Sequence, residues 1–202
     1  MPLPLYDFVM QTLLENDRAK KIHLAIQQAW ASTIDKYPER GRWRRKATFR
    51  NILWEIAIRE LQTLEDRDPD FKCVLHKDTA SFILENEVLI RFKHADISLV
   101  TANYPTCEAS AFDNHDVDLY GYSGLQRVEL CYVLNEFETA LIWVGVVARN
   151  KGSHLWKIEL VNEGILPQTV EPMFDEITDT AKLARIKTSQ PEKNAKKKKD
   201  NG

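Results

Sequence analysis

The 202-residue chain has little glycine, proline or cysteine and no long hydrophobic run. Seven Gly and eight Pro are too few for a collagen-like or low-complexity protein. The three cysteines (Cys73, Cys107 and Cys131) are odd in number and widely spaced, which fits a reducing cytoplasm better than a disulfide framework. No apolar run approaches the roughly 20 residues of a membrane span, and the first residues lack signal-peptide features. We therefore expect a globular cytoplasmic protein without a membrane span.

Charge is distributed unevenly along the chain, although the net charge is only −2. Residues 36–50 hold seven Lys or Arg against one Glu, and residues 181–202 hold eight against two acids, so each segment carries +6. The rest of the chain therefore carries −14. Because residues 188–202 are polar, contain a proline and lack apolar anchors, we expect residues 181–202 to form a disordered basic tail, either a nonspecific clamp on nucleic acid or a solvated terminus.

Two segments, residues 17–37 and 48–64, repeat apolar side chains at three- and four-residue steps, which is typical of amphipathic helices. Asn16 or Asp17 is expected to cap the first helix, and Pro38 is expected to end it. A Gly-containing loop joins the two segments, so the pattern predicts an antiparallel helical hairpin. A short third helix is predicted within the first 15 residues.

After Pro69 the pattern changes to short segments rich in β-branched and aromatic residues, which are typical of strands. Residues 125–134 fit either a strand or a helix, and a Ser123/Gln126 capping box favours the helix. A weak final helix is expected over residues 172–187. The predicted strands, with hairpin turns at Asn86 and at residues 150–153, are 71–76, 81–85, 87–93, 97–102, 141–149 and 154–161.

Together these segments predict an α+β fold, with an N-terminal helical hairpin, a mainly antiparallel β-sheet and one or two further helices. Residues 1–180 are interpreted as a single domain, with a helical part at 1–68 and a sheet part at 69–180, ahead of the 181–202 tail. The polar stretch 103–124 is long for a connection in a compact domain, and such loops are usually functional or mobile.

The first candidate site is the basic loop between the two long helices. Arginine forks match phosphate oxygens, an exposed aromatic side chain can stack on an unpaired base, and the N-terminus of the following helix favours anions. This composition indicates binding of nucleic acid or phosphate. The alternatives are a loop that docks a partner protein and a solvated loop without a ligand. In the solvated loop, Trp43 would simply pack beneath the helices. The candidate binding residues are Arg40, Arg42, Trp43, Arg44, Arg45, Lys46 and Arg50.

Two other clusters could carry enzyme chemistry. Three carboxylates and an imidazole within six residues could bind Mg²⁺, Mn²⁺ or Zn²⁺, or could simply form a solvated acidic loop. These candidate metal ligands are Asp113, His115, Asp116 and Asp118. The candidate catalytic residues, which could instead form an ordinary turn, are His76, Lys77 and Asp78. The chain contains no HExxH motif, glycine-rich phosphate loop or kinase signature, so a divalent metal is the only cofactor suggested.

Several segments carry a resemblance to a known group of proteins: residues 76–96, the NYPT segment at 103–106, residues 117–135, and the segments LIWVGVVAR and HLWKIEL within 141–160. They resemble bacterial and prophage toxin-like proteins whose genes neighbour a helix-turn-helix regulator linked to a zinc metallopeptidase. The resemblance covers residues 20–161 and implies a toxin–antitoxin or phage-defence effector held in check by that regulator as its partner protein. It carries over no catalytic residues.

Three hypotheses about function therefore stay open at this point. The first is such an effector, which contacts nucleic acid or another cellular target through the basic loop. The second is a metal-dependent nuclease or phosphohydrolase that uses the 113–118 cluster. The third is a non-catalytic protein-interaction module built on the helical hairpin.

Overall fold

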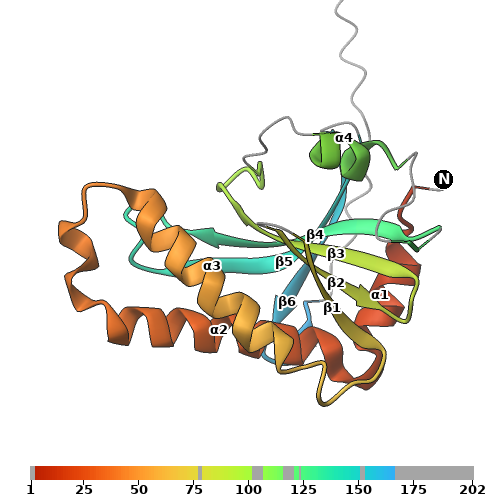
Figure 1. Ribbon diagram of the computed structural model, residues 1–202, viewed down its shortest axis with the longest axis horizontal. Coiled ribbons are helices and arrows are strands. Elements are labelled where there is room, and N and C mark those ends of the chain that lie inside the picture. Colours follow the sequence, from red (N-terminus) through yellow and green to blue (C-terminus); the bar gives the residue numbers. More distant parts are fainter. Residues whose placement is uncertain are drawn as a thin grey trace, which may run out of the picture. The chain divides into compact units, whose positions relative to one another are not determined.

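Two long antiparallel helices follow a short one in the N-terminal part of the chain, as the periodicity predicts. The structure is a computed structural model, which describes residues 3–76, 79–101, 107–115, 121–122, 124–150 and 153–166. Helix α1 spans Tyr6–Leu14, α2 spans Arg18–Lys36 and α3 spans Lys46–Gln62, with 3₁₀ turns at Glu15–Asp17 and Pro38–Arg42. In Figure 1, α2 and α3 run side by side along one face of the sheet.

The start of α2 differs from the expected side-chain cap. Asp17 occupies the N-cap position but makes no capping hydrogen bond through its side chain. Asn16 and Asp17 both adopt the left-handed conformation, with φ of 52° and 54°. The chain passes from α1 into α2 through this kink, and Asn and Asp are the residues that tolerate left-handed backbone best after glycine. The two residues therefore turn the chain rather than cap the helix.

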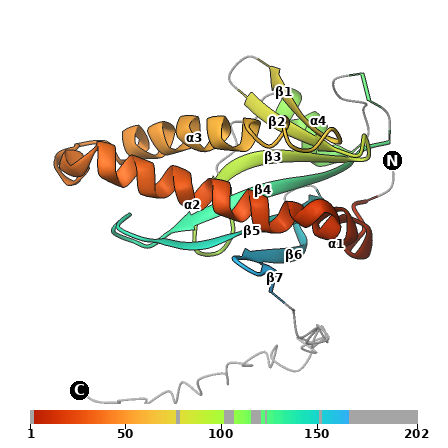
Figure 2. The same cartoon turned by 90° about the horizontal axis from the view of Figure 1, so that it is seen from below.

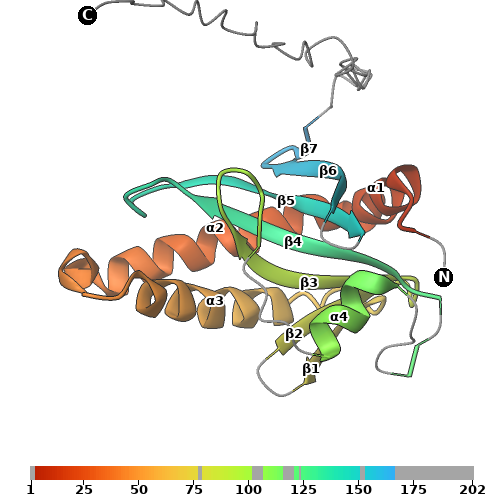
Figure 3. The same cartoon turned by 90° about the horizontal axis from the view of Figure 1, so that it is seen from above.

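The described residues contain seven strands, which form one sheet in the order β1-β2-β3-β4-β5-β6-β7. Neighbouring strands are antiparallel except β3 and β4, which are parallel. A parallel pair needs a long crossover. Residues 96–125 provide it, and they include helix α4 (Cys107–Asn114), which lies on the opposite side of the sheet from α2 and α3 (Figure 3). The strands are β1 Phe71–His76, β2 Thr79–Leu84, β3 Val88–Ala95, β4 Gln126–Leu134, β5 Leu141–Asn150, β6 Ser153–Val161 and β7 Gly164–Ile165. The α+β fold class is thus confirmed.

Strand β4 overturns the prediction of a helix over residues 125–134. It lies between β3 and β5, and eight of its nine residues are buried. Alternate side chains, from Val128 to Leu134, face the helices, whereas Arg127, Glu129, Cys131 and Val133 are buried on the opposite face. A strand with both faces covered loses the simple apolar and polar alternation of a half-exposed strand. Pairing with two neighbouring strands therefore decides the conformation of this segment, whose local sequence pattern fits both a helix and a strand.

The prediction of a strand over residues 97–102 is also wrong for residues 97–101, the part that the structure describes. Asp96 closes a turn there, because its Oδ1 accepts hydrogen bonds from the amides of Ser98 and Val100, each at 2.9 Å. Thr101 forms only an isolated β-bridge, to the last residue of β3. Asp side chains commonly close such turns by bonding to the backbone two residues on. The turn ends β3 and starts the crossover to β4.

Some predictions concern residues that the structure does not describe. They include the helix over 172–187 and the disordered tail over 181–202, so the division of the chain into domain and tail stays a prediction. Within the described part of the chain, no helix is long and apolar enough to cross a membrane.

The main hydrophobic core lies between the helices and one face of the sheet. Buried apolar side chains of α1, α2 and α3 pack there against alternate residues of β2 to β6. On β3 and β4, Phe92 and Tyr132 stack with their ring centroids 5.3 Å apart. This packing places the α2–α3 loop and the β4–β5 hairpin at the same end of the sheet, as Figure 2 shows. That shared end is where the candidate binding residues gather.

Candidate functional site

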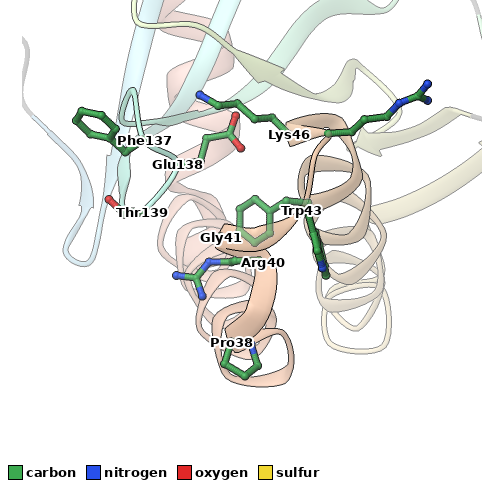
Figure 4. Close-up of a pocket in the computed structure, with 10 residues that line it drawn as sticks. Pro38, Arg40, Gly41, Trp43, Lys46, Phe137, Glu138 and Thr139 are labelled. Atoms are coloured by element: carbon green, nitrogen blue, oxygen red, sulfur yellow. The ribbon is translucent and has the colours of Figure 1, made fainter.

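Two segments about 90 residues apart in the sequence meet at one end of the sheet. They are Pro38–Lys46, which connects α2 to α3, and residues 135–140, the turn of the β4–β5 hairpin. We call this surface the basic end. Between the two segments lies a cavity of about 260 Å³. Its lining includes, from the helix side, Arg40, Trp43, Arg45 and Lys46, and, from the hairpin side, Phe137 and Glu138 (Figure 4).

Aromatic packing fixes the shape of the loop. Pro38 begins a 3₁₀ helix, and the Trp43 amide donates to the Arg40 carbonyl oxygen at 3.0 Å. The Trp43 ring is half-buried and packs edge-on against Tyr37, with centroids 5.6 Å apart. The guanidinium of Arg40 lies 5.8 Å from the centre of the Phe49 ring. Trp43 thus packs against the helices, as the alternative to base stacking expects, and it holds the loop in place.

Two cations tie the loop and α3 to the hairpin. Lys46 Nζ donates to the carbonyl oxygen of Glu136 at 3.1 Å. Arg50 donates twice to Glu138 Oε1, at 2.8 and 2.5 Å. The hairpin itself is closed by Asn135, whose Oδ1 accepts the Thr139 amide at 2.7 Å. Of the candidate binding residues, Arg50 is therefore already paired and acts as a brace for the site.

Exposed cations, Lys46 among them, surround the N-terminus of α3. Arg42, Arg44, Arg45 and Lys46 are exposed. Arg45 occupies the N-cap position, makes no side-chain capping bond, and no acidic residue lies in the first turn. The N-terminus of a helix carries partial positive charge and outward amide donors, so nearby cations raise its free energy and a bound anion lowers it. This is the arrangement expected of an anion-binding site.

The hairpin adds Phe137, which the sequence analysis did not single out. Its side chain is 77% exposed, and it lies at the rim of the cavity, on the other side of the hairpin backbone from the Glu138 carboxylate (Figure 4). The signal that could have found it is a single aromatic residue among polar residues between two strands. Reading residues 125–134 as a helix hid that hairpin.

The proposed metal ligands are not brought together in the described residues. Asp113 lies on α4, half-buried, and burial together with a neighbouring carboxylate on β4 raises its pKa. His115 is buried, with Nε2 2.9 Å from a backbone carbonyl oxygen of β5. Asp116 and Asp118 fall outside the described residues. Among the residues that are described, no group of three or more His, Cys, Asp or Glu side chains could hold a metal ion.

The proposed catalytic group is described only in part. His76 ends β1, and its carbonyl oxygen accepts a hydrogen bond from Thr79 Oγ1 at 2.8 Å. Lys77 and Asp78 fall outside the described residues. The described contacts of His76 are those of a turn between β1 and β2, so a catalytic role for the three residues stays a prediction.

A buried polar layer joins α4 and the crossover to the sheet. Glu129, only 2% exposed, accepts hydrogen bonds from Arg149 Nε at 2.6 Å and from Thr101 Oγ1 at 3.0 Å. Arg127 donates to the carbonyl oxygen of Ala111 in α4 at 2.5 Å. These bonds satisfy charges that would be costly to bury without partners. Sequence reasoning missed the layer because its members lie on β4, on β5 and in the crossover, far apart in the sequence.

Comparisons of the chain with protein-family models, curated proteins and solved structures found no match. The resemblance to toxin-like proteins therefore stays a prediction, as does the regulator it implies as a partner. Function is inferred from the geometry and charge of the basic end.

Proposed function

We propose that the protein binds nucleic acid through the phosphate backbone at the basic end. The observation that carries the proposal is the start of α3, where Arg45 and Lys46 occupy the N-cap and first helical positions, at which a helix normally has a capping side chain and acidic residues, and the exposed Arg42 and Arg44 lie just before them. That charge arrangement costs stability in the isolated protein, and a bound phosphate would offset the cost. A solvated loop without a ligand would gain nothing from it.

The arrangement of the cations favours a polymeric anion over a small phosphate compound. Arg45 and Lys46 line the cavity, whereas the exposed Arg42 and Arg44 lie outside its lining, so the cations extend along the segment beyond the cavity. An extended row of arginine forks and lysine amines can follow successive phosphates of a strand. The negative charge on the rest of the chain would orient a polyanion towards this end.

We propose the toxin-like role as the biological setting of this binding. The support is the resemblance described above, which suggests an effector held inactive by a partner regulator. Metal-dependent hydrolysis gains no support from the described residues, because Asp113 and His115 make separate contacts and form no metal-binding group there.

A charge-reversal experiment tests the binding proposal. Arg44→Glu/Arg45→Glu should weaken binding of a fluorescent oligonucleotide at least tenfold in an anisotropy titration at low salt, and the loss should be similar for different base sequences. The matched control is Lys20→Glu/Arg59→Glu, which makes the same charge change at the opposite end of α2 and α3. The basic tail is identical in both variants, so its contribution cancels. Equal affinities of the two variants, or no binding by the unmodified protein, would refute the proposal.

A further inference from the structure

Phe137 exposes its apolar ring to solvent next to a cluster of cations. It is 77% exposed at the tip of the β4–β5 hairpin and lies on the rim of the cationic cavity. Isolated apolar residues are common on protein surfaces, but a large aromatic ring beside a cluster of arginines is a recurrent feature of nucleic-acid sites, where it stacks on bases. The hairpin that presents it is held in place by the Arg50–Glu138 ion pair and by Lys46.

Charge differs between the two sides of this hairpin. On the side of the α2–α3 loop, the cavity is lined by three cations, Arg40, Arg45 and Lys46, and by one carboxylate, that of Glu138. A second hollow of about 360 Å³, on the side of β3, is lined by apolar residues, by His94, by Arg50 and by the carboxylates of Asp96, Glu136 and Glu138, so its carboxylates outnumber its one arginine. Phosphates are attracted to the first side and repelled from the second. A strand that keeps its backbone on the side of the α2–α3 loop would therefore direct its bases towards the hairpin tip.

We infer that the basic end selects single-stranded over double-stranded nucleic acid, with phosphates beside Arg45 and Lys46 and an unpaired base stacked on Phe137. The inference rests on the proposed function and specifies its ligand. In a duplex the faces of the bases are covered by their neighbours, so Phe137 could reach a base face only at a duplex end. A single strand can turn a base out and place it on the ring. Single-stranded DNA and RNA share this chemistry.

The test compares three ligands of one base sequence: a 12-nucleotide single-stranded DNA, the matching RNA, and the blunt DNA duplex. Phe137→Ala should weaken binding of at least one single strand by about 5-fold to 150-fold, the range for loss of one base–aromatic stack. Phe137→Trp should keep the affinity within a few-fold, because the larger ring still stacks. The control is Leu75→Ala, which removes an exposed apolar side chain from the edge strand β1, away from the basic end.

The outcomes separate this inference from the proposed function. Tighter binding of either single strand than of the duplex, lost in Phe137→Ala but kept in Leu75→Ala, supports the inference, and the preferred strand identifies the sugar. If charge reversal at Arg44 and Arg45 abolishes binding while Phe137→Ala leaves it unchanged, the inference is wrong and the proposed function stands. Equal affinity for duplex and single strands also overturns the inference. If none of the three ligands binds, the proposed function itself fails.

Discussion

The N-cap of α3 offers a substitution that should stabilise the protein while weakening its binding. Arg45 has φ −112° and ψ 113°, the extended conformation typical of an N-cap residue, but its side chain makes no cap. Arg45→Asp would place a carboxylate where it can accept an amide of the first turn. It would also replace a cation at the positive end of the helix with an anion.

The expected gain follows from these two effects. A side-chain N-cap contributes about 1 kcal/mol, and a favourable charge at a helix terminus contributes about 0.3–1 kcal/mol. The free energy of unfolding should therefore rise by about 1–2 kcal/mol, and the Tm by about 2–8 °C for a chain of this length. Arg45→Ala, which removes the cation without supplying a cap, should gain only the smaller, charge-dependent part.

Urea unfolding without ligand measures the stability change, and oligonucleotide titration measures the binding change. We expect Arg45→Asp to be more stable than the unmodified protein and to bind at least several-fold more weakly. High salt should reduce the part of the gain that comes from charge, because it shortens the screening length. An Arg45→Asp protein that is no more stable than the unmodified protein, or that binds equally well, would refute the interpretation of this helix start as an anion site.

The remaining predictions concern the fold and the biological setting. Arg18 is 1% exposed and bonds to Asp68 and Glu85, so Arg18→Ala should lower the free energy of unfolding by about 3–5 kcal/mol in urea titrations; a loss below about 1 kcal/mol would contradict this role. The hydrogen bond from Arg18 holds the pKa of Asp68 below its ordinary value of 3.8, so the stability from this pair should be complete well above that pH and lost as pH falls through the lowered pKa; equal acid sensitivity in Arg18→Ala would argue against it. Induced alone in a bacterial host, the chain should arrest growth, and co-expression of a regulator of the kind that the resemblance implies should relieve the arrest; normal growth with soluble protein present would count against the toxin-like role.

How far the sequence predicts this molecule depends on whether the relevant contacts are local. The helices α2 and α3 follow from apolar spacing within each segment, and the basic loop follows from contiguous charges. The conformation of β4 does not follow from its own sequence, because it is decided by pairing with β3 and β5 and by polar partners on the crossover and β5.

The candidate site shows the same division between local and distant information. Its cations are adjacent in the sequence and were identified there. Arg50 and Glu138 are separated by 88 positions, and Lys46 and Glu136 by 90, so the hairpin's part in the site emerges only from the fold. The same long-range contact places Phe137 beside the cations, whereas Trp43, the nearest aromatic in sequence, packs on Tyr37.

The most direct test of nucleic-acid binding at the basic end is the salt dependence of affinity for a single-stranded oligonucleotide. Each phosphate contact on a single strand contributes about −0.7 to the slope of log Kobs against log salt concentration. Arg44→Ala/Arg45→Ala should therefore make the slope less negative by about 1.4, whereas Lys20→Ala/Arg59→Ala should leave it unchanged. Identical slopes for the two variants would contradict the account.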